Sequence, residues 1–429
     1  MKLIDFVIEK TKVFLGSGTV NELIENVDGI CIKYKFKKQK YDFNHLVVVF
    51  SGYGDGSEFT YNMENVLTYC PCNVLWVKDE FFGRCSYYLC HDRDFKISHS
   101  VNKFIEMKLA ELNITKDECT VVGFSKGGTA AIYFGMVFGY HNILASAPQY
   151  KLGSFVKKNR PETLKHMAGD HEDSQAYLDN IMLSSIEDYP ESLNKNIYII
   201  ISPSDPDFDE QNYYSNRLNG IGNLNIFVSE SEFVRTHAMV TMHNVPLILS
   251  IIYSLGSGVS PKYGNVVLKP SAPKAIHESK SKEVVVQLRK SQISGSKIYP
   301  EGVGIIRGVN CNGYGDIQYK LVLVSSDSAR FEYELAKSNK PILTREFFKS
   351  SFVVYDKCWF CTKSFSGLDL SDLPVGEYTA YLILKSRDEK FERPITSVMS
   401  IDIKSNDNKY SYRFKSSSEG TTLEKINFV

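Results

Sequence analysis

The sequence predicts a chain in two parts: a mostly parallel sheet with helices on both faces, followed by a smaller all-β sandwich. Over the first 256 residues, short apolar runs that suit fully buried strands alternate with helical patterns. From residue 284 the pattern changes to short alternating segments separated by turn residues, with weak helical periodicity. A stretch rich in Ser, Pro and Lys lies between the two parts.

The strand candidates of the first part are its short apolar runs, at residues 45–50, 73–77, 120–123, 143–145, 197–201 and 224–228. Helical patterns lie between them. Ser98 can cap one helix, and residues 129–134 and 245–253 form two more. Between residues 149 and 196 the pattern breaks into polar pieces. This predicts an insertion over the strand ends that acts as a lid or an acceptor surface.

The same patterns give the domain boundaries. We predict an α/β domain over residues 1–256, a linker over 257–283, a β-sandwich over 284–405 and a weakly ordered tail over 406–429. The sandwich strands are expected at residues 284–288, 319–324, 331–335 and 378–384. The tail is rich in Ser, Lys and Asn, although Tyr410, Tyr412 and Phe414 could pair as an edge strand.

The composition excludes several classes of protein. Of the 429 residues, 43% are apolar and 23% are charged, which is typical of a globular protein. The 50 basic residues balance the 50 acidic ones, so we expect no nucleic-acid partner. Asp5 and Glu9 interrupt the N-terminal apolar run, and no run approaches the ~18 apolar residues of a membrane span. We therefore expect a cytoplasmic protein without a signal peptide or transmembrane segment.

The nine cysteines are expected to be free thiols in a reducing compartment. Cys358 and Cys361 form one Cys-x-x-Cys, and Cys70 and Cys72 form a Cys-x-Cys. A closed zinc site needs four ligands at matching spacing, and that pattern is absent. The sequence therefore predicts no metal site, and we interpret these residues as buried thiols.

The most informative stretch is Gly-Phe-Ser-Lys-Gly-Gly at residues 123–128. It contains Gly-x-Ser-x-Gly, and it follows a strand candidate and precedes a helix candidate. In that setting the serine occupies a sharp turn that exposes its hydroxyl above the sheet, and side chains at the flanking glycine positions would collide. Ser125 is therefore the candidate nucleophile. The alternative is a glycine-rich turn that only allows close packing of helix and strand.

A serine hydroxyl needs an acid–base pair to become a nucleophile, and in this arrangement the acid and then the base follow the serine in the chain. Asp205 is the candidate acid because it follows strand 197–201 and precedes Pro206, which fixes the turn. Asp207 and Asp209 compete for this role. All three could instead be solvated turn residues.

His237 is the candidate base because it lies between strand 224–228 and the last helix of the first part. His243, six residues later, is the alternative. The developing oxyanion needs two backbone N–H donors. We assign one to Lys126, which follows Ser125, and the other to the glycine-rich loop at residues 50–56, with Tyr53 as first choice and Gly52 as second.

At these residues the chain resembles an α/β-hydrolase over about residues 40–255. The resemblance rests on residues 50–54 (Phe-Ser-Gly-Tyr-Gly), residues 123–128, Ser-Asp-Pro at 204–206 and Thr-His at 236–237. More narrowly, the loop at 50–54, Val-Lys-Asp at 77–79 leading into Cys-Ser-Tyr-Tyr-Leu at 85–89, and residues 123–128 are similar to bacterial capsular polysaccharide O-acetyltransferases and accessory-secretion glycan acetyltransferases.

This resemblance implies acetyl transfer from acetyl-CoA to a sugar hydroxyl through an acyl-serine. It implies a polysaccharide or oligosaccharide acceptor and allows association with capsule assembly proteins. The C-terminal domain lies outside the resemblance and could hold polysaccharide. No coenzyme A signature is visible. Lys157, Lys158 and Arg160 could meet its phosphates or form a solvated loop.

Three hypotheses follow. In the first, a sugar hydroxyl attacks the acyl-serine and gives an O-acetylated glycan. In the second, water attacks and the protein is an esterase; the two differ in whether the site excludes water and positions an alcohol. In the third, the chain is a non-catalytic scaffold that binds a glycan or a protein through its β-domain.

Overall fold

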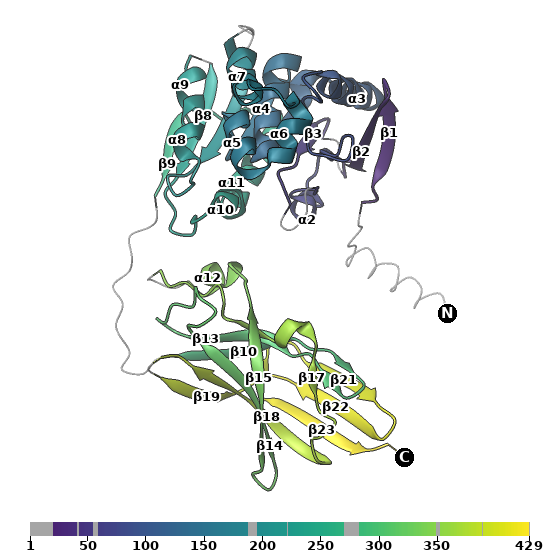
Figure 1. Cartoon of the computed structure of the whole chain (residues 1–429), viewed down its shortest axis with the longest axis vertical. Coiled ribbons are helices and arrows are strands. Elements are labelled where there is room, and N and C mark those ends of the chain that lie inside the picture. Colours follow the sequence, from purple (N-terminus) through teal and green to yellow (C-terminus); the bar gives the residue numbers. More distant parts are fainter. Residues whose placement is uncertain are drawn as a thin grey trace. The chain divides into compact units, whose positions relative to one another are not determined.

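The computed structural model describes residues 20–40, 43–54, 59–187, 195–220, 222–269, 283–348, 352–387 and 389–428. The chain divides into two compact units, Met1–Pro270 and Ser271–Val429, and each has its own core (Figure 1). The N-terminal apolar run, in which we expect no signal peptide, lies outside the described residues. So do residues 188–194 of the predicted insertion and 270–282 of the predicted linker.

The first unit is built on a nine-stranded sheet in the order β1-β2-β4-β3-β5-β6-β7-β8-β9. Strands β3 to β9 all run parallel, and β1 and β2 form an antiparallel hairpin that pairs β2 antiparallel with β4. Because parallel strands end at the same edge of a sheet, the loops that follow them gather there. The strands are β1 (Leu23–Val27), β2 (Ile30–Lys37), β3 (Leu46–Phe50), β4 (Asn73–Val77), β5 (Cys119–Phe124), β6 (Asn142–Ser146), β7 (Asn196–Ile201), β8 (Asn223–Ser229) and β9 (Asn265–Leu268).

Helices cover both faces of this sheet, as the doubly apolar strands predict (Figure 1). Along β3, Val48 belongs to one apolar cluster and Val47 and Val49 to another, because successive side chains point to opposite faces. The first cluster includes residues of α3 and α4, and the second includes residues of α10 and α11. The helices outside the insertion are α2 (Glu64–Leu67), α3 (Lys96–Leu112), α4 (Lys126–Phe138), α8 (Phe208–Gln211), α9 (Tyr213–Arg217), α10 (His237–His243) and α11 (Val245–Gly256), with a 3₁₀ turn at Lys116–Glu118.

The polar stretch that we predicted to be an insertion forms three helices. They are α5 (Leu152–Asn159), α6 (Pro161–Ala168) and α7 (Ser174–Glu187). Leu152, Val156 and Met167 are buried in the main cluster, while the charged residues of α5 lie outside it. The polar composition therefore belongs to the exposed faces of amphipathic helices.

Three details of the first unit differ from the sequence prediction. The hairpin β1–β2 precedes the first predicted strand, at residues 45–50, and extends the sheet. Helix α3 begins at Lys96, and Ser98 instead donates its hydroxyl to the Phe95 carbonyl within the helix. The predicted linker contains β9, which pairs with β8. Its residues are only half-buried, so the Ser- and Pro-rich composition around them masked a short edge strand.

The second unit is a β-structure with little helix, in agreement with its strand-like sequence. Among the described residues, one hydrogen-bonded path runs in the order β20-β10-β13-β16-β15-β14-β18-β23-β22-β21, with β19 paired to β18, and β11, β12 and β17 form a separate small sheet. The predicted sandwich is not confirmed. Strand β15 pairs with β14 through Arg330–Leu335 and with β16 through Ala336–Ser338, so the strands on either side of it are joined in one path. The elements are β10 (Val284–Lys290), β11 (Ile293–Ser294), β12 (Lys297–Ile298), β13 (Glu301–Ile306), β14 (Gln318–Ser325), β15 (Arg330–Ser338), α12 (Ile342–Glu346), β16 (Trp359–Cys361), a 3₁₀ turn (Lys363–Phe365), β17 (Leu368–Asp369), β18 (Gly376–Lys385), β19 (Lys390–Pro394), β20 (Thr396–Ser397) and β21 (Ile401–Asn406).

The prediction of a weakly ordered tail at residues 406–429 is wrong. Residues 406–429 contain β22 (Tyr410–Ser416) and β23 (Thr421–Asn427), and β22 pairs with both β21 and β23. Tyr412 and Phe414 are buried in the core of the second unit. Alternation of these aromatic residues with polar ones was the stronger signal, and β22 is an interior strand rather than an edge strand.

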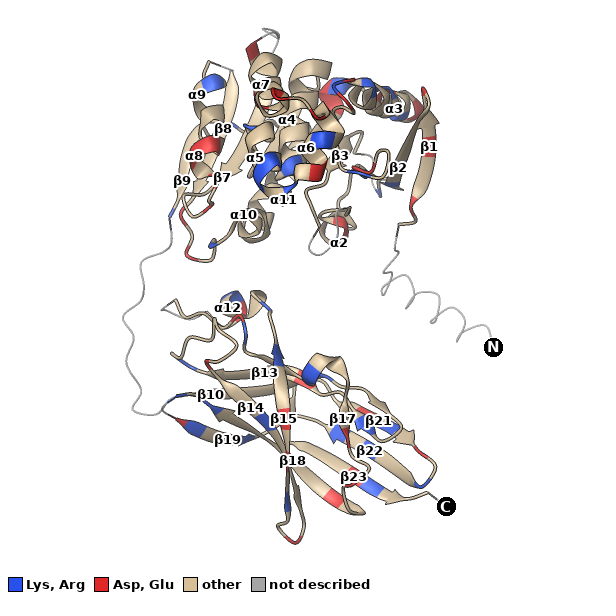
Figure 2. Cartoon of the chain, in the orientation of Figure 1, with Lys and Arg blue, Asp and Glu red and all other residues tan. Residues whose placement is uncertain are grey.

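Acidic and basic residues are interspersed over both units, consistent with the balanced formal charge (Figure 2). Within the described ranges, no single helix is long and apolar enough to cross a membrane. Helices α10 and α11 meet that criterion only as a pair, and they are bent by 56° relative to each other.

Candidate active site

Ser125 occupies the turn between β5 and α4, with φ 53° and ψ −121°. Such positive φ values are rare for residues with a side chain and mark local strain. Hydrogen bonds hold the turn in place. The Ser125 N–H donates to the Ser146 carbonyl at 2.8 Å, and the Ser125 carbonyl accepts from the N–H groups of Gly128 and Thr129.

The turn requires glycine on both sides of Ser125. A Cβ atom on Gly123 would lie 1.8 Å from the carbonyl oxygen of Gly127, and one on Gly127 would lie 2.0 Å from that of Phe50. Neither contact can be relieved by a side-chain rotation, because both involve backbone atoms. Close packing and an exposed serine, which the sequence offered as alternatives, are therefore two properties of one turn.

The structure brings the three predicted residues into one hydrogen-bonded chain. His237 Nε2 lies 2.7 Å from Ser125 Oγ, and His237 Nδ1 lies 2.8 Å and 3.1 Å from the two carboxylate oxygens of Asp205. His237 is the first residue of α10, and Asp205 follows β7. An ionised carboxylate only accepts, so we assign the ring proton to Nδ1 and leave Nε2 to accept the serine proton. The catalytic roles of these residues stay predictions.

Asp205 is held as a carboxylate by several donors. It is 3% exposed, and besides His237 it accepts from the Asp207 N–H at 3.0 Å and from Gln211 Nε2 at 2.8 Å. Burial alone would raise the pKa of Asp205, but the hydrogen bond and charge of His237 and the other donors outweigh it and lower the pKa. The carboxylate therefore stays charged and can orient the imidazole.

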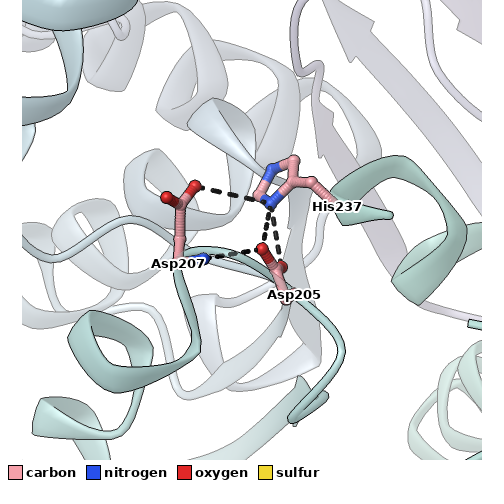
Figure 3. Close-up of side chains that lie close together, drawn as sticks. All are labelled: Asp205, Asp207 and His237. Atoms are coloured by element: carbon pink, nitrogen blue, oxygen red, sulfur yellow. Dashed lines mark hydrogen bonds and ion pairs between the residues drawn. The ribbon is translucent and has the colours of Figure 1, made fainter. Parts of the chain in front are cut away.

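Asp207, one of the two competitors for the acid role, also approaches the imidazole. Its Oδ2 lies 3.7 Å from His237 Nδ1, on the same ring nitrogen that Asp205 contacts (Figure 3). Burial lowers the pKa of His237, but the hydrogen bond to Asp205 and the charges of Asp205, Asp207 and Glu210 together outweigh burial, so the net shift of the pKa is upward.

The other two candidates do not approach Ser125. Asp209 is exposed within α8, and His243 at the end of α10 packs against Phe233.

The three N–H groups predicted to bind the oxyanion differ in whether they already donate to another acceptor. Within the described part of the chain, the N–H groups of Lys126 and Tyr53 have no recorded acceptor. The N–H of Gly52 donates to Asn62 Oδ1 at 2.6 Å, so this second choice is already engaged. Asn62 in turn donates its N–H to Ser51 Oγ at 2.9 Å, which fixes the loop beside the serine. Lys126 and Tyr53 are therefore the available pair, and their role stays a prediction.

The side chain of Lys126 forms a buried ion pair directly behind the serine turn. Its Nζ lies 2.7 Å from Asp79 Oδ2, with both side chains 1% exposed, and 5.2 Å from the centroid of the Tyr53 ring. Asp79 also accepts three backbone N–H bonds from residues 86–88 and the hydroxyl of Ser86. The pair joins the first turn of α4 to the segment after β4, and the Lys126 ammonium also contacts the ring of Tyr53 in the loop after β3.

Gln149, which follows β6, approaches Ser125 as well. Its Nε2 lies 3.3 Å from Ser125 Oγ, and its Oε1 accepts the hydroxyl of Tyr87 at 2.7 Å. Gln149 and Tyr87 are both fully buried. Sequence analysis missed Gln149, Gln211 and Asn62, because no short motif contains them, and it missed the pairing of Lys126 with Asp79, because the two motifs that contain these residues are far apart in the chain. Their position after strands β6, β7, β3 and β4 was the available signal.

A cavity of about 1000 Å³ opens onto Ser125 and His237. Tyr53, Tyr61 and Phe155 contribute aromatic surface to its lining. The insertion contributes Lys158 and Arg160, and Figure 2 shows basic residues on α5 and α6. The Arg160 guanidinium lies 5.0 Å from the Tyr53 ring centroid. Lys157 does not line the cavity; its Nζ donates to Gln175.

Asp205, Asp207 and His237 are also a group whose ligand atoms lie close enough to hold a metal ion, within 4.8 Å of one another. The atoms concerned are those of the acid–base pair, and His237 Nδ1 would have to lose its proton to bind a cation. The geometry of Asp205 and His237 is that of a hydrogen-bonded pair. The prediction that the site uses no metal stays a prediction.

The strand order, the strained strand–serine–helix turn and the order Ser, Asp, His along the chain define an α/β-hydrolase-like domain. No protein-family model matches this chain, and no curated protein sequence does.

Solved structures do resemble the chain. The capsule O-acetyltransferase of Neisseria meningitidis serogroup A is 20% identical, with a TM-score of 0.44 over 53% of this chain and 96% of that one. A glycosylation-associated protein complex from Streptococcus agalactiae is 20% identical, with a TM-score of 0.44 over 53% of this chain and 45% of that one. An esterase of Pyrobaculum calidifontis is 15% identical, with a TM-score of 0.40 over 61% of this chain and 94% of that one.

Proposed function

We propose that this protein transfers an acyl group through an acyl-serine at Ser125, and that the product is an O-acetylated bacterial surface polysaccharide formed from acetyl-CoA. The observation that carries acyl chemistry is the contact of His237 Nε2 with Ser125 Oγ at 2.7 Å, with Asp205 on the other ring nitrogen. His237 takes the serine proton as Oγ attacks the acyl carbon, and Asp205 stabilises the imidazolium that forms. The N–H groups of Tyr53 and Lys126 receive the oxyanion.

The acetyl acceptor and donor are argued from the sequence resemblance and from the cavity. A volume of about 1000 Å³ exceeds the need of an acetyl group and leaves room for the rest of a donor or for a sugar. Lys158 and Arg160 supply positive charge at the mouth, which suits the phosphates of acetyl-CoA. Aromatic rings at Tyr53 and Tyr61 suit a sugar face.

The first experiment asks whether Ser125 carries the reaction. Purified full-length protein is incubated with an aryl acetate, and Ser125→Ala is compared with the unchanged protein. We expect turnover to fall by about 10⁴-fold or more, as for loss of a triad nucleophile, and the acetyl group to be found on Ser125 by mass spectrometry. Equal turnover in the variant would support the non-catalytic scaffold.

The second experiment separates transfer from hydrolysis. Acetyl-CoA is supplied with and without capsule-type oligosaccharides, and acetate and acetylated glycan are quantified. We expect acetylated glycan to form at the expense of acetate. Release of acetate at the same rate with and without glycan would identify an esterase.

The third experiment tests the donor. We expect Lys158→Gln and Arg160→Gln to raise KM for acetyl-CoA but not for a neutral aryl acetate, because only the thioester donor carries phosphates. Lys157→Gln is the matched control, since Lys157 lies on the same helix but does not line the cavity. Equal KM values for acetyl-CoA in all three variants would exclude these contacts.

A further inference from the structure

The proton positions around Ser125 fix the orientation of the Gln149 amide. His237 donates its Nδ1–H to Asp205, so Nε2 accepts the proton of Ser125. A serine hydroxyl has only one proton, so the remaining contact of Oγ, with Gln149 at 3.3 Å, must have the amide as donor. Oε1 then faces the Tyr87 hydroxyl, which can donate to it at 2.7 Å.

The result is a continuous series of donors that runs in one direction. It passes from Tyr87 to Gln149, from Gln149 to Ser125, from Ser125 to His237 and from His237 to Asp205. Gln149 is held independently of its side chain, because its N–H and carbonyl both bond the Thr129 hydroxyl at 2.8 Å and its carbonyl also accepts from Tyr214. The amide therefore approaches Oγ from a rigid support.

Burial limits what this amide can contact. Gln149 is 0% exposed and does not line the cavity, so a substrate oxygen in the cavity does not reach it without displacement. Ser125, in contrast, does line the cavity. The amide therefore acts on the serine oxygen and not on the carbonyl oxygen of the substrate. Because the Gln149 side chain is buried, its hydrogen bond to a developing charge is less weakened by water.

We propose that Gln149 is a catalytic hydrogen-bond donor to Ser125 Oγ and that it promotes both formation and breakdown of the acyl-serine. This inference rests on the proposed function. In the first step Oγ bonds to the acyl carbon, its proton passes to His237, and the donor's leaving group departs with that proton. In the second step the acceptor hydroxyl gives its proton to His237 and bonds to the acyl carbon. The Oγ–carbon bond then breaks with its electron pair on Oγ, and the proton returns to Oγ.

The hydrogen bond from Gln149 stabilises the two transition states more than it stabilises the acyl-serine between them. In the acyl-serine, the lone pair of Oγ is delocalised into the ester carbonyl, so Oγ is a weak acceptor. In both transition states Oγ carries partial negative charge and accepts more strongly. Only interactions that are stronger in the transition state accelerate the reaction, and a hydrogen bond to a charged oxygen is one of these.

The test uses full-length protein, a chromogenic aryl acetate and rapid-mixing kinetics, which report acylation as a burst and deacylation as the steady state. The variant is Gln149→Leu combined with Tyr87→Phe, so that no buried hydroxyl loses its acceptor. We expect both rate constants to fall about 10- to 100-fold, the range for a hydrogen bond to a charged group, with KM little changed. Rate constants equal to those of the unchanged protein would overturn the proposal.

A matched control separates this effect from general destabilisation. Tyr140 donates its hydroxyl to Asn102 at 2.8 Å, which is also a buried tyrosine–amide pair, but Tyr140 precedes β6 at the other edge of the sheet. The double variant Tyr140→Phe, Asn102→Leu should lose comparable thermal stability and keep its rate constants. If it loses as much activity as the Gln149 variant, the role of Gln149 is only structural.

A single variant, Gln149→Glu, gives a signature that a structural role would not produce. A charged carboxylate cannot donate to Oγ and competes with His237 for the serine proton, whereas a protonated carboxyl can donate. We expect the activity of this variant to peak at lower pH than that of the unchanged protein. An identical pH profile would count against the proposal. If Ser125→Ala removes the burst while the Gln149 variants are unaffected, only this inference fails; if Ser125→Ala leaves the burst intact, the proposed function fails.

Discussion

At the residue scale, the proposed mechanism makes His237 the group whose protonation sets the working pH. Its Nδ1 lies between Asp205 and Asp207, and their negative charges favour the imidazolium. A folded pKa above the ordinary value of 6.5 means that this contact adds stability below pH 6.5, and that the contribution is lost as pH rises through the folded pKa. The proposed mechanism needs the neutral ring, so we expect kcat/KM to rise with pH and to have its midpoint above 6.5.

Asp207→Asn should move that midpoint to lower pH, because it removes a negative charge 3.7 Å from Nδ1 while Asp205 keeps its hydrogen bond. The measurement is the pH profile of kcat/KM with a neutral aryl acetate. Asp209→Asn is the control: it removes the same charge from an exposed position in the same turn. The explanation fails if the two variants shift the midpoint equally. The negative charge of Glu210 also favours the imidazolium, so Glu210→Gln should shift the midpoint in the same direction. Burial raises the pKa of Glu210 to about 7, so this charge acts mainly above that pH.

The sequence could predict the contact of Ser125, Asp205 and His237 because each follows a buried strand, and parallel strands end at one edge. It could not predict Gln149 or the Asp79–Lys126 pair. Those contacts depend on how closely β4, β5 and β6 bring their following loops together, and on two consecutive tyrosines, Tyr87 and Tyr88, in the left-handed region. Neither feature has a local sequence signal.

At the element scale, the crossing of β5, α4 and β3 leaves no volume for a side chain. Gly127→Ala would place its Cβ 2.0 Å from the Phe50 carbonyl oxygen, and the backbone of β3 would have to shift. We expect the free energy of unfolding to fall by about 3 kcal/mol or more and activity to be lost. The measurement is denaturant unfolding of the purified variant.

Gly139→Ala provides the comparison at the other end of α4. Gly139 has φ 79°, and a Cβ there would meet nothing within 4 Å. Gly139→Ala should therefore lower the free energy of unfolding only by the cost of a left-handed conformation for alanine, about 1 kcal/mol. Similar losses at both glycines would mean that close packing at the serine turn is not the cause.

The Asp79–Lys126 pair ties α4 to the segment after β4. Lys126→Met leaves the buried carboxylate of Asp79 without its cation, and we expect it to lower the free energy of unfolding by about 3 kcal/mol. Asp79→Leu should cost at least as much, because it also removes the acceptor of three backbone N–H groups.

Combining the two substitutions tests the coupling. The double variant should lose clearly less stability than the sum of the single variants, because it buries no unpaired charge. Thermal and denaturant unfolding of the four proteins complete the cycle. Strict additivity would show that the two side chains do not stabilise each other.

At the scale of the whole molecule, the sequence pattern changes near residue 284, beside β10, and the two compact units divide at residues 270 and 271. The edges of the predicted parts were less accurate, because composition reports exposure and not pairing. Strand β9 and strands β22 and β23 lie in Ser- and Lys-rich sequence, yet β9 completes the first sheet and Phe414 and Leu423 fill the second core. A strand with one exposed face can be polar in composition and still be required by the fold.

The residues proposed for catalysis, and all residues that line the cavity, belong to the first unit. Each unit also has a core of its own, which is the condition for independent folding. A truncated protein ending at residue 269, so that β9 is retained, should therefore cleave an aryl acetate with the kcat/KM of the full chain. Residues 283–429 expressed alone should unfold in a single cooperative transition. If the truncated protein is folded by circular dichroism but inactive toward the aryl acetate, the second unit takes part in the chemistry. If it keeps that activity but loses acetyl transfer to oligosaccharide, the second unit binds the acceptor.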